Sequence, residues 1–139
     1  MAEWHRPTAD TKFHIDLDWW KQNDSDIGVY LREALCDRCR ADYGGYEGEE
    51  EIDWVDEETA EVKRVHGLWH IIRTCCSLKP DFVATGTPIV DAIFLTLIAN
   101  GNTPLSVKEL HELVDRRPPA TLLRILTAGP VYMGIRPAM

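Results

Sequence analysis

The four cysteines of this 139-residue chain stand in two short groups, and their spacing is typical of a metal site. Cys36 and Cys39 are separated by two residues, and Cys75 and Cys76 are adjacent. Thiolates bind zinc in tetrahedral sites because the ion is borderline-soft and imposes no geometry of its own. A two-residue spacer within a turn lets both sulfurs point to one ion. The sequence therefore predicts a structural zinc ion at Cys36 and Cys39.

The second half of the predicted site has four candidates, because two histidines precede the second cysteine pair. His66 and His70 are four residues apart and would share one face of a helix. His70 and Cys75 diverge by about 140° on a regular helix, so Cys75 needs a frayed or 3₁₀ helix end to join His70. The predicted ligand set is Cys36, Cys39, His70 and Cys75, with Cys76 and His66 as substitutes.

Other interpretations of the cysteines stay open. They can pack as small hydrophobic side chains in the core, with His70 facing solvent. An iron–sulfur cluster would use all four thiolates, although the adjacent ligands Cys75 and Cys76 would strain it. A catalytic zinc needs an open coordination position and a nearby base, and the chain contains neither H-E-x-x-H nor the deaminase pattern H-x-E with P-C-x-x-C. We therefore expect a protein that is not an enzyme.

The charge of the chain is uneven and argues against wrapping of nucleic acid by its first part. The net charge is −8, and residues 1–80 carry 18 acidic and 10 basic side chains, whereas residues 81–139 carry five of each. An acidic field repels a phosphate backbone. No apolar run reaches the roughly 18 residues of a membrane span, and the N-terminus lacks a signal pattern. We expect a cytoplasmic protein with reduced thiols and no membrane contact.

Both strands and helices are predicted before residue 80, where alternating and helical patterns follow one another. The predicted elements are a strand at 13–20, a helix at 27–36, a turn carrying the first cysteine pair, an exposed loop at 41–51, a β-hairpin with strands at 52–56 and 60–65, and a helix at 68–78.

Residues 88–139 follow a more regular, helical pattern. A helix over 88–99 is expected to end at Asn100-Gly101. Ser106 caps a second helix over 107–114, with Glu109 completing a capping box. A third helix over 120–126 follows two prolines, and a short strand is expected at 131–135.

The stretch from Ala92 to Ile135 resembles helix-turn-helix domains of the HARE type, as in the delta subunit of bacterial RNA polymerase. Those domains run as an apolar helix, an N-G-x-x-P-L-S link, an x-x-E-L helix, a third helix and a glycine-containing strand. The matching residues are Asn100-Gly101-Asn102-Thr103-Pro104-Leu105-Ser106, Lys108-Glu109-Leu110 and Tyr132-Met133-Gly134-Ile135. The resemblance covers about a third of the chain, and no full wing hairpin fits before Met139.

The resemblance implies a winged helix and transcription-associated contact with DNA or RNA polymerase. A helix that enters the major groove needs basic or amide side chains at its exposed positions. The candidate contact residues are Arg116, Arg117, Thr121, Arg124 and Arg136.

We therefore predict an α+β protein in two parts. Residues 1–80 form a zinc-stapled part with a β-hairpin, and residues 81–139 form a winged-helix-like unit of three helices. The expected function is that of a transcription-associated regulator contacting DNA or RNA polymerase. A zinc-stapled adaptor or accessory subunit that binds only protein is the alternative, and no small-molecule substrate is expected.

Overall fold

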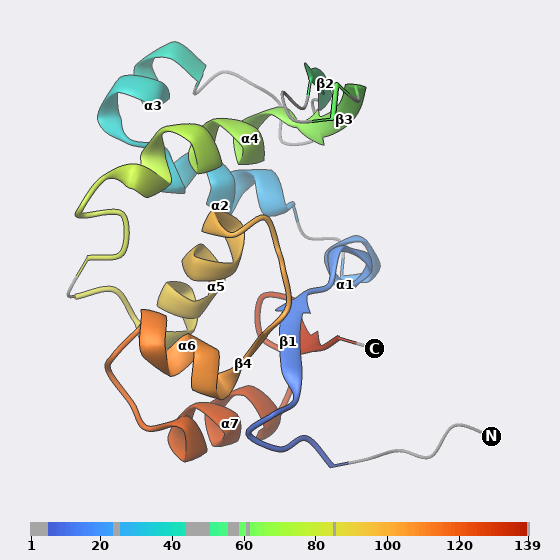
Figure 1. Ribbon diagram of the computed structural model, residues 1–139, viewed down its shortest axis with the longest axis vertical. Coiled ribbons are helices and arrows are strands. Elements are labelled where there is room, and N and C mark those ends of the chain that lie inside the picture. The colour runs from blue at the N-terminus through green and yellow to red at the C-terminus, as the bar shows by residue number, and fades with distance from the viewer. Residues whose placement is uncertain are drawn as a thin grey trace. The chain divides into compact units, whose positions relative to one another are not determined.

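The structure of the protein is a computed structural model that describes residues 6–23, 26–43, 51–55, 59–60, 62–84 and 86–138 (Figure 1). The chain divides into two compact units. The terminal unit joins Met1–Asn23 to Val83–Met139, and the inserted unit is the continuous segment Asp24–Phe82. Both contain helices and strands, in agreement with the predicted α+β class. None of the described helices is long and apolar enough to cross a membrane.

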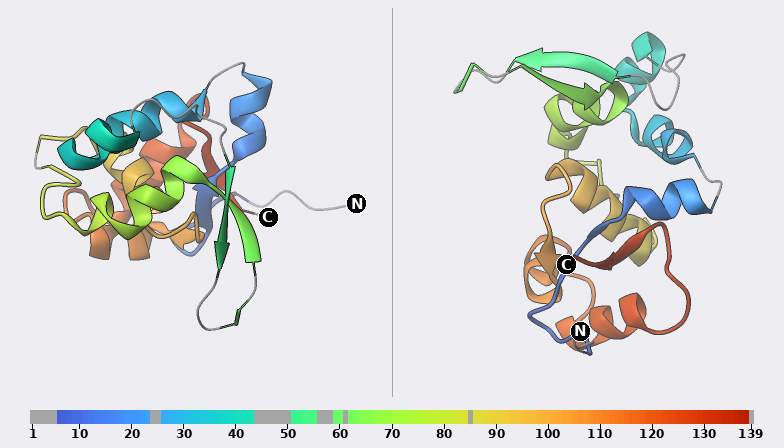
Figure 2. Two further views of the ribbon diagram at one scale, coloured as in Figure 1. Left: turned by 90° about the horizontal axis from the view of Figure 1, so that it is seen from above. Right: turned by 90° about the vertical axis from the view of Figure 1, so that its right-hand side faces the viewer.

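A small antiparallel sheet organises the terminal unit. Its central strand is β1 (Lys12–Ile15), which lies between β4 (Leu105–Ser106) and β5 (Ile135–Pro137) (Figure 2). Phe13 faces Leu105 on one side and Pro137 on the other. The alternation of Phe13 and Ile15 buries both side chains completely or nearly so, which fixes the register because a slip by one residue would expose them.

Four helices complete the described part of the terminal unit. They are α1 (Leu17–Gln22), α5 (Ile89–Ala99), α6 (Val107–Leu113) and α7 (Pro119–Thr127). Helix α6 begins at the predicted capping box, in which Ser106 and Glu109 bond each other's backbone N–H groups. Helix α5 is the most apolar and contributes the largest share of the core. The buried apolar residues of the unit are Phe13, Ile15, Trp20, Ala92, Ile93, Phe94, Leu97, Ile98, Leu105, Val107, Leu110, Val114, Leu122, Met133 and Ile135.

The described residues of the inserted unit form three helices, a hairpin and one 3₁₀ turn. Its elements are α2 (Ile27–Ala34), α3 (Asp37–Tyr43), β2 (Glu51–Val55), β3 (Val62–His66), α4 (Gly67–Thr74) and η1 (Cys76–Leu78). Strands β2 and β3 pair antiparallel, which confirms the predicted hairpin. Helix α2 packs on α4. Among the residues of this unit whose side chains the structure describes, the buried ones are Leu31, Leu35, Cys39, Leu68, Ile72 and Cys76.

Several predicted elements differ from the structure. The helix predicted over 68–78 ends at Thr74, and Cys76–Leu78 form the 3₁₀ turn η1 instead. The strand predicted over 13–20 ends at Ile15, because Asp16 accepts the Asp18 N–H and caps α1. The first cysteine pair lies at the start of helix α3 rather than in an isolated turn. The predicted C-terminal strand is displaced to Ile135–Pro137 by a turn in which Tyr132 and Ile135 form an isolated bridge. Most of the predicted loop at 41–51 lies outside the described residues.

The predicted division at residue 80 also differs from the structure at the N-terminus. The second boundary between the units lies at Phe82–Val83, two residues later than predicted. Residues up to Asn23, however, belong to the terminal unit, whereas the sequence placed them in the predicted zinc-stapled part. The reason is β1, whose two neighbours in the sheet both come from beyond residue 100.

Candidate metal centre

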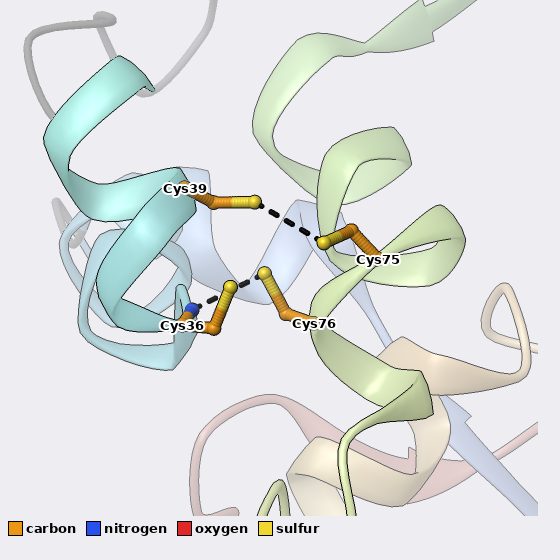
Figure 3. A group of neighbouring side chains, drawn as sticks. All are labelled: Cys36, Cys39, Cys75 and Cys76. Atoms are coloured by element: carbon orange, nitrogen blue, oxygen red, sulfur yellow. Dashed lines mark hydrogen bonds between the residues drawn. The ribbon is translucent and has the colours of Figure 1, made fainter.

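The four cysteine sulfurs of the inserted unit converge on one point. The Sγ atoms of Cys36, Cys39, Cys75 and Cys76 all lie within 4.8 Å of one another (Figure 3). They are free thiols, and none is joined in a disulfide. Cys39 and Cys76 are buried, with exposed fractions of 4% and 1%, whereas Cys36 and Cys75 are half-buried. The group thus has a buried side and a side that solvent can reach.

The first cysteine pair is held at the N-terminus of α3. The chain leaves α2 at Leu35, whose backbone is extended. The backbone carbonyl of Cys36 then accepts the Arg40 N–H at 2.8 Å. The Arg40 guanidinium donates back to the carbonyls of Glu33 and Leu35, which anchors the turn between the helices. Cys36 therefore lies just before the first turn of α3 and Cys39 within it, on the same side of the helix.

The second pair converges because helix α4 ends between its two cysteines. Adjacent residues on a regular helix point about 100° apart and cannot easily reach one ion. Cys75 leaves helical geometry, with φ −133° and ψ −66°, although its N–H still donates to Ile71. Its carbonyl then accepts from Leu78 and opens the 3₁₀ turn η1. This change of backbone direction brings both sulfurs to the same side, facing α3 (Figure 3).

The sulfur arrangement fits a tetrahedral metal ion. Four thiolates at the zinc–sulfur distance of about 2.3 Å stand about 3.8 Å from one another. The Sγ atoms of Cys39 and Cys75 are 3.4 Å apart, and the whole group stays within 4.8 Å. The Cys36 N–H also donates to Cys76 Sγ at 3.2 Å. A hydrogen bond of this kind favours the charged form of the sulfur, which is the form that binds metal.

The pKa values of the thiols show how strongly the four groups influence one another. The backbone N–H of Cys39 and the neighbouring thiols lower the pKa of Cys36 to about 7. Burial raises the pKa of Cys39, and the three neighbouring thiols raise it further. Burial also raises the pKa of Cys76. Four thiolates this close repel one another, so a divalent cation between them is what would allow all four to ionise.

Three of the four predicted ligands lie in the cysteine group. Cys36, Cys39 and Cys75 belong to the group, and the substitute Cys76 takes the fourth place; His70 is not a member of the group among the described residues. His70 lies within α4, before the break at Cys75 that redirects the chain. Its pKa is lowered by burial and then by the nearby Arg73 charge. His66 ends β3, and its side chain lies outside the described part.

The residues predicted to contact nucleic acid or polymerase differ in their bonding within the terminal unit. Arg116 donates to the carbonyls of Thr87 and Ala84, and Arg136 forms an ion pair with Asp16. Arg117 donates to the Arg116 carbonyl. Thr121 is half-buried, and Arg124 is the exposed basic residue of α7.

The link from Asn100 to Ser106, part of the resemblance described above, has a structural explanation. Asn102, at a positive φ of 63°, bonds both backbone groups of Ile15: its Oδ1 accepts at 2.7 Å and its Nδ2 donates at 2.8 Å. The side chain of Asn100 likewise forms two hydrogen bonds with the backbone of Thr103, accepting from its N–H and donating to its carbonyl. These residues hold the sheet and the turn together, a role that spacing alone did not reveal.

Comparisons with known proteins give no relative of this chain: no protein-family model matches the sequence, and no match is found among curated proteins or solved structures.

Proposed function

We propose that the protein is a non-enzymatic regulator that binds another protein, and that its four cysteines hold a structural zinc ion. RNA polymerase is the partner that the HARE-type resemblance implies. The observation that supports the zinc is the convergence of all four sulfurs from two separate parts of the inserted unit. If all four thiolates bind, a tetrahedral ion has no open position for substrate or water, so its role is structural rather than catalytic.

The side chains of the terminal unit favour a protein partner over DNA. The guanidinium groups of Arg116 and Arg136 are bonded within the terminal unit, so much of the predicted positive charge is already engaged. In the same unit the side chains of Leu113 and Tyr132 are 62% and 64% exposed. Large exposed apolar side chains are more typical of protein contacts than of contacts to a phosphate backbone.

Elemental analysis of the purified protein tests the metal. About one zinc per chain is expected, and a variant with Cys36→Ser and Cys39→Ser should lose it together with the fold of the inserted unit. The variant His70→Ala serves as a matched control and should keep its zinc. Protein purified without chelator that contains no metal would contradict the proposal, and so would zinc loss in His70→Ala alone.

Binding measurements separate the protein partner from DNA. We expect the protein to bind purified RNA polymerase and to show no salt-dependent binding to duplex DNA. Leu113→Lys, which places a charge at an exposed apolar position, should weaken the polymerase complex without affecting stability. DNA binding that weakens steeply with salt, and is lost in a variant with Arg117→Ala and Arg124→Ala, would favour the predicted DNA contact instead.

A further inference from the structure

Two of the four sulfurs are in direct contact across separate elements. Cys39 Sγ, in the first turn of α3, lies 3.4 Å from Cys75 Sγ at the junction of α4 and η1 (Figure 3). Within this pair Cys39 is buried and Cys75 is half-buried, so Cys75 is the more accessible thiol. Of the other two, Cys76 is buried and its Sγ accepts the Cys36 N–H, whereas Cys36 is half-buried. A bridge between the adjacent Cys75 and Cys76 would require a distorted ring.

We propose that the four-cysteine group is a redox-sensitive metal site, in which a peroxide joins Cys39 to Cys75 as a disulfide and the ion is released. The inference rests on the zinc occupancy proposed above and adds a means of regulating it. The disulfide would keep α3 joined to the end of α4 through Cys39 and Cys75, while the links from the ion to Cys36 and Cys76 would be lost.

The chemistry balances with the peroxide as the only oxidant. The Cys75 thiolate attacks one peroxide oxygen, the O–O bond breaks, and the departing hydroxide takes a proton to form water. Cys39 then attacks the Cys75 sulfenic acid, the S–O bond breaks, and a second hydroxide is protonated to water. Two electrons pass from the two thiolates to the peroxide. The disulfide sulfurs are no longer anionic ligands, so Cys36 and Cys76 alone retain the ion poorly.

The test follows zinc and disulfides together in the zinc-loaded protein. Hydrogen peroxide should release about one zinc per chain, measured with a colorimetric zinc chelator. Peptide mapping should place a single disulfide between Cys39 and Cys75, and a thiol reductant with added zinc should restore the starting protein. Peroxide treated with catalase is the control. Zinc retained under peroxide, or a disulfide between any other pair, would overturn the inference.

Two variants sharpen the result, because each leaves a site of three cysteines and one histidine. Cys75→His removes one partner of the disulfide and should keep its zinc under peroxide. Cys36→His changes the other half-buried ligand, leaves the disulfide pair intact and should lose zinc as the native protein does. Equal zinc loss from both variants would contradict the assignment of the pair, and where neither variant binds zinc the disulfide map of the native protein decides. A purified native protein without zinc would instead refute the proposed metal, independently of any redox behaviour.

Discussion

At the scale of single residues, close backbone approaches explain positions whose role the sequence leaves open. Gly134 has a positive φ of 76° and lies against Trp20, whose indole N–H donates to the Met133 carbonyl at 3.1 Å. A Cβ at Gly134 would stand 2.7 Å from Trp20 Nε1 and 3.1 Å from the Asp16 carbonyl oxygen. Both the backbone conformation and the space therefore require glycine.

Gly134→Ala should destabilise the terminal unit strongly. The left-handed conformation alone costs about 1–2 kcal/mol for a residue with a Cβ, and the contact with Trp20 adds to it. Gly129→Ala is the matched control, since Gly129 has φ 87° but nothing within 4 Å of the added Cβ. Urea unfolding of both variants gives the free energies of unfolding. Equal losses would show that the Trp20 contact contributes nothing.

The Asp16–Arg136 ion pair predicts a pH dependence at the same scale. Burial raises the pKa of Asp16, but the hydrogen bond and charge of Arg136 and the Asp18 N–H outweigh it, so the pKa is lowered overall. A carboxyl group with a lowered folded-state pKa stabilises the folded protein at neutral pH. This contribution is lost as the pH falls below the unfolded value of about 3.9 and through the folded value.

Asp16→Asn separates the charge from the helix cap, because its side-chain oxygen can still accept the Asp18 N–H. The native protein should be more stable than the variant near neutral pH, and the difference should shrink as the pH falls below the unfolded value of about 3.9 and vanish below the lowered folded-state pKa of Asp16. Comparing both proteins at each pH cancels any acid effect common to them, including that of the thiols. A constant difference from neutral to acidic pH would show that the ion pair does not stabilise the fold.

At the scale of elements, the terminal unit depends on a side chain that continues its sheet. The amide of Asn102, in the turn after α5, bonds both backbone groups of Ile15 where β1 has run past its pairing with β4. The turn from α5 to β4 is thereby tied to the central strand. Without the Asn102 amide, the part-buried N–H and carbonyl of Ile15 would lose these two hydrogen bonds.

Asn102→Ala should cost about 1–3 kcal/mol, since part-buried backbone groups lose their partners. Asn102→Gly is the control, because it tolerates the positive φ but also lacks the amide. We expect both variants to be destabilised in urea unfolding, and the alanine variant more so. A glycine variant as stable as the native protein would show that the amide contacts are dispensable and that only the backbone conformation matters.

At the scale of the whole molecule, the four cysteines of the candidate metal site all belong to one unit. The terminal unit contains no cysteine, and its sheet and core come from its own two segments. The inserted unit, Asp24–Phe82, is short, and a hydrophobic core in a domain below about 70–80 residues supplies little stability, which a bound metal can supplement. Zinc should therefore control the fold of one unit only.

Removal of zinc by a chelator should unfold the inserted unit while the terminal unit stays folded. Hydrogen exchange read by mass spectrometry should show amides of α3 and α4 losing protection, whereas those of β1 and α5 keep it. Added zinc should restore the protection. Loss of protection throughout both units on chelation would indicate a single cooperative fold instead.

The sequence by itself determined the helices α2, α5, α6 and α7, the β2–β3 hairpin and the capping box at Ser106, within a few residues at their ends. These features depend on local periodicity and capping, which neighbouring residues specify. It also identified the cysteines as a candidate metal site, because thiol chemistry and spacing are visible in the chain.

Only the tertiary structure decided which residues complete that site. Cys76 joins the group because α4 breaks at Cys75, whereas the sequence predicted His70 in this place and Cys76 as a substitute. The place of β1 was likewise hidden, since its partners β4 and β5 lie more than 90 residues away in the sequence. The hydrogen bonds of Arg116 and the ion pair of Arg136 were hidden for the same reason, since their partners are also distant in the sequence. Pairings between distant segments depend on how the chain folds back on itself, and local pattern carries no record of that.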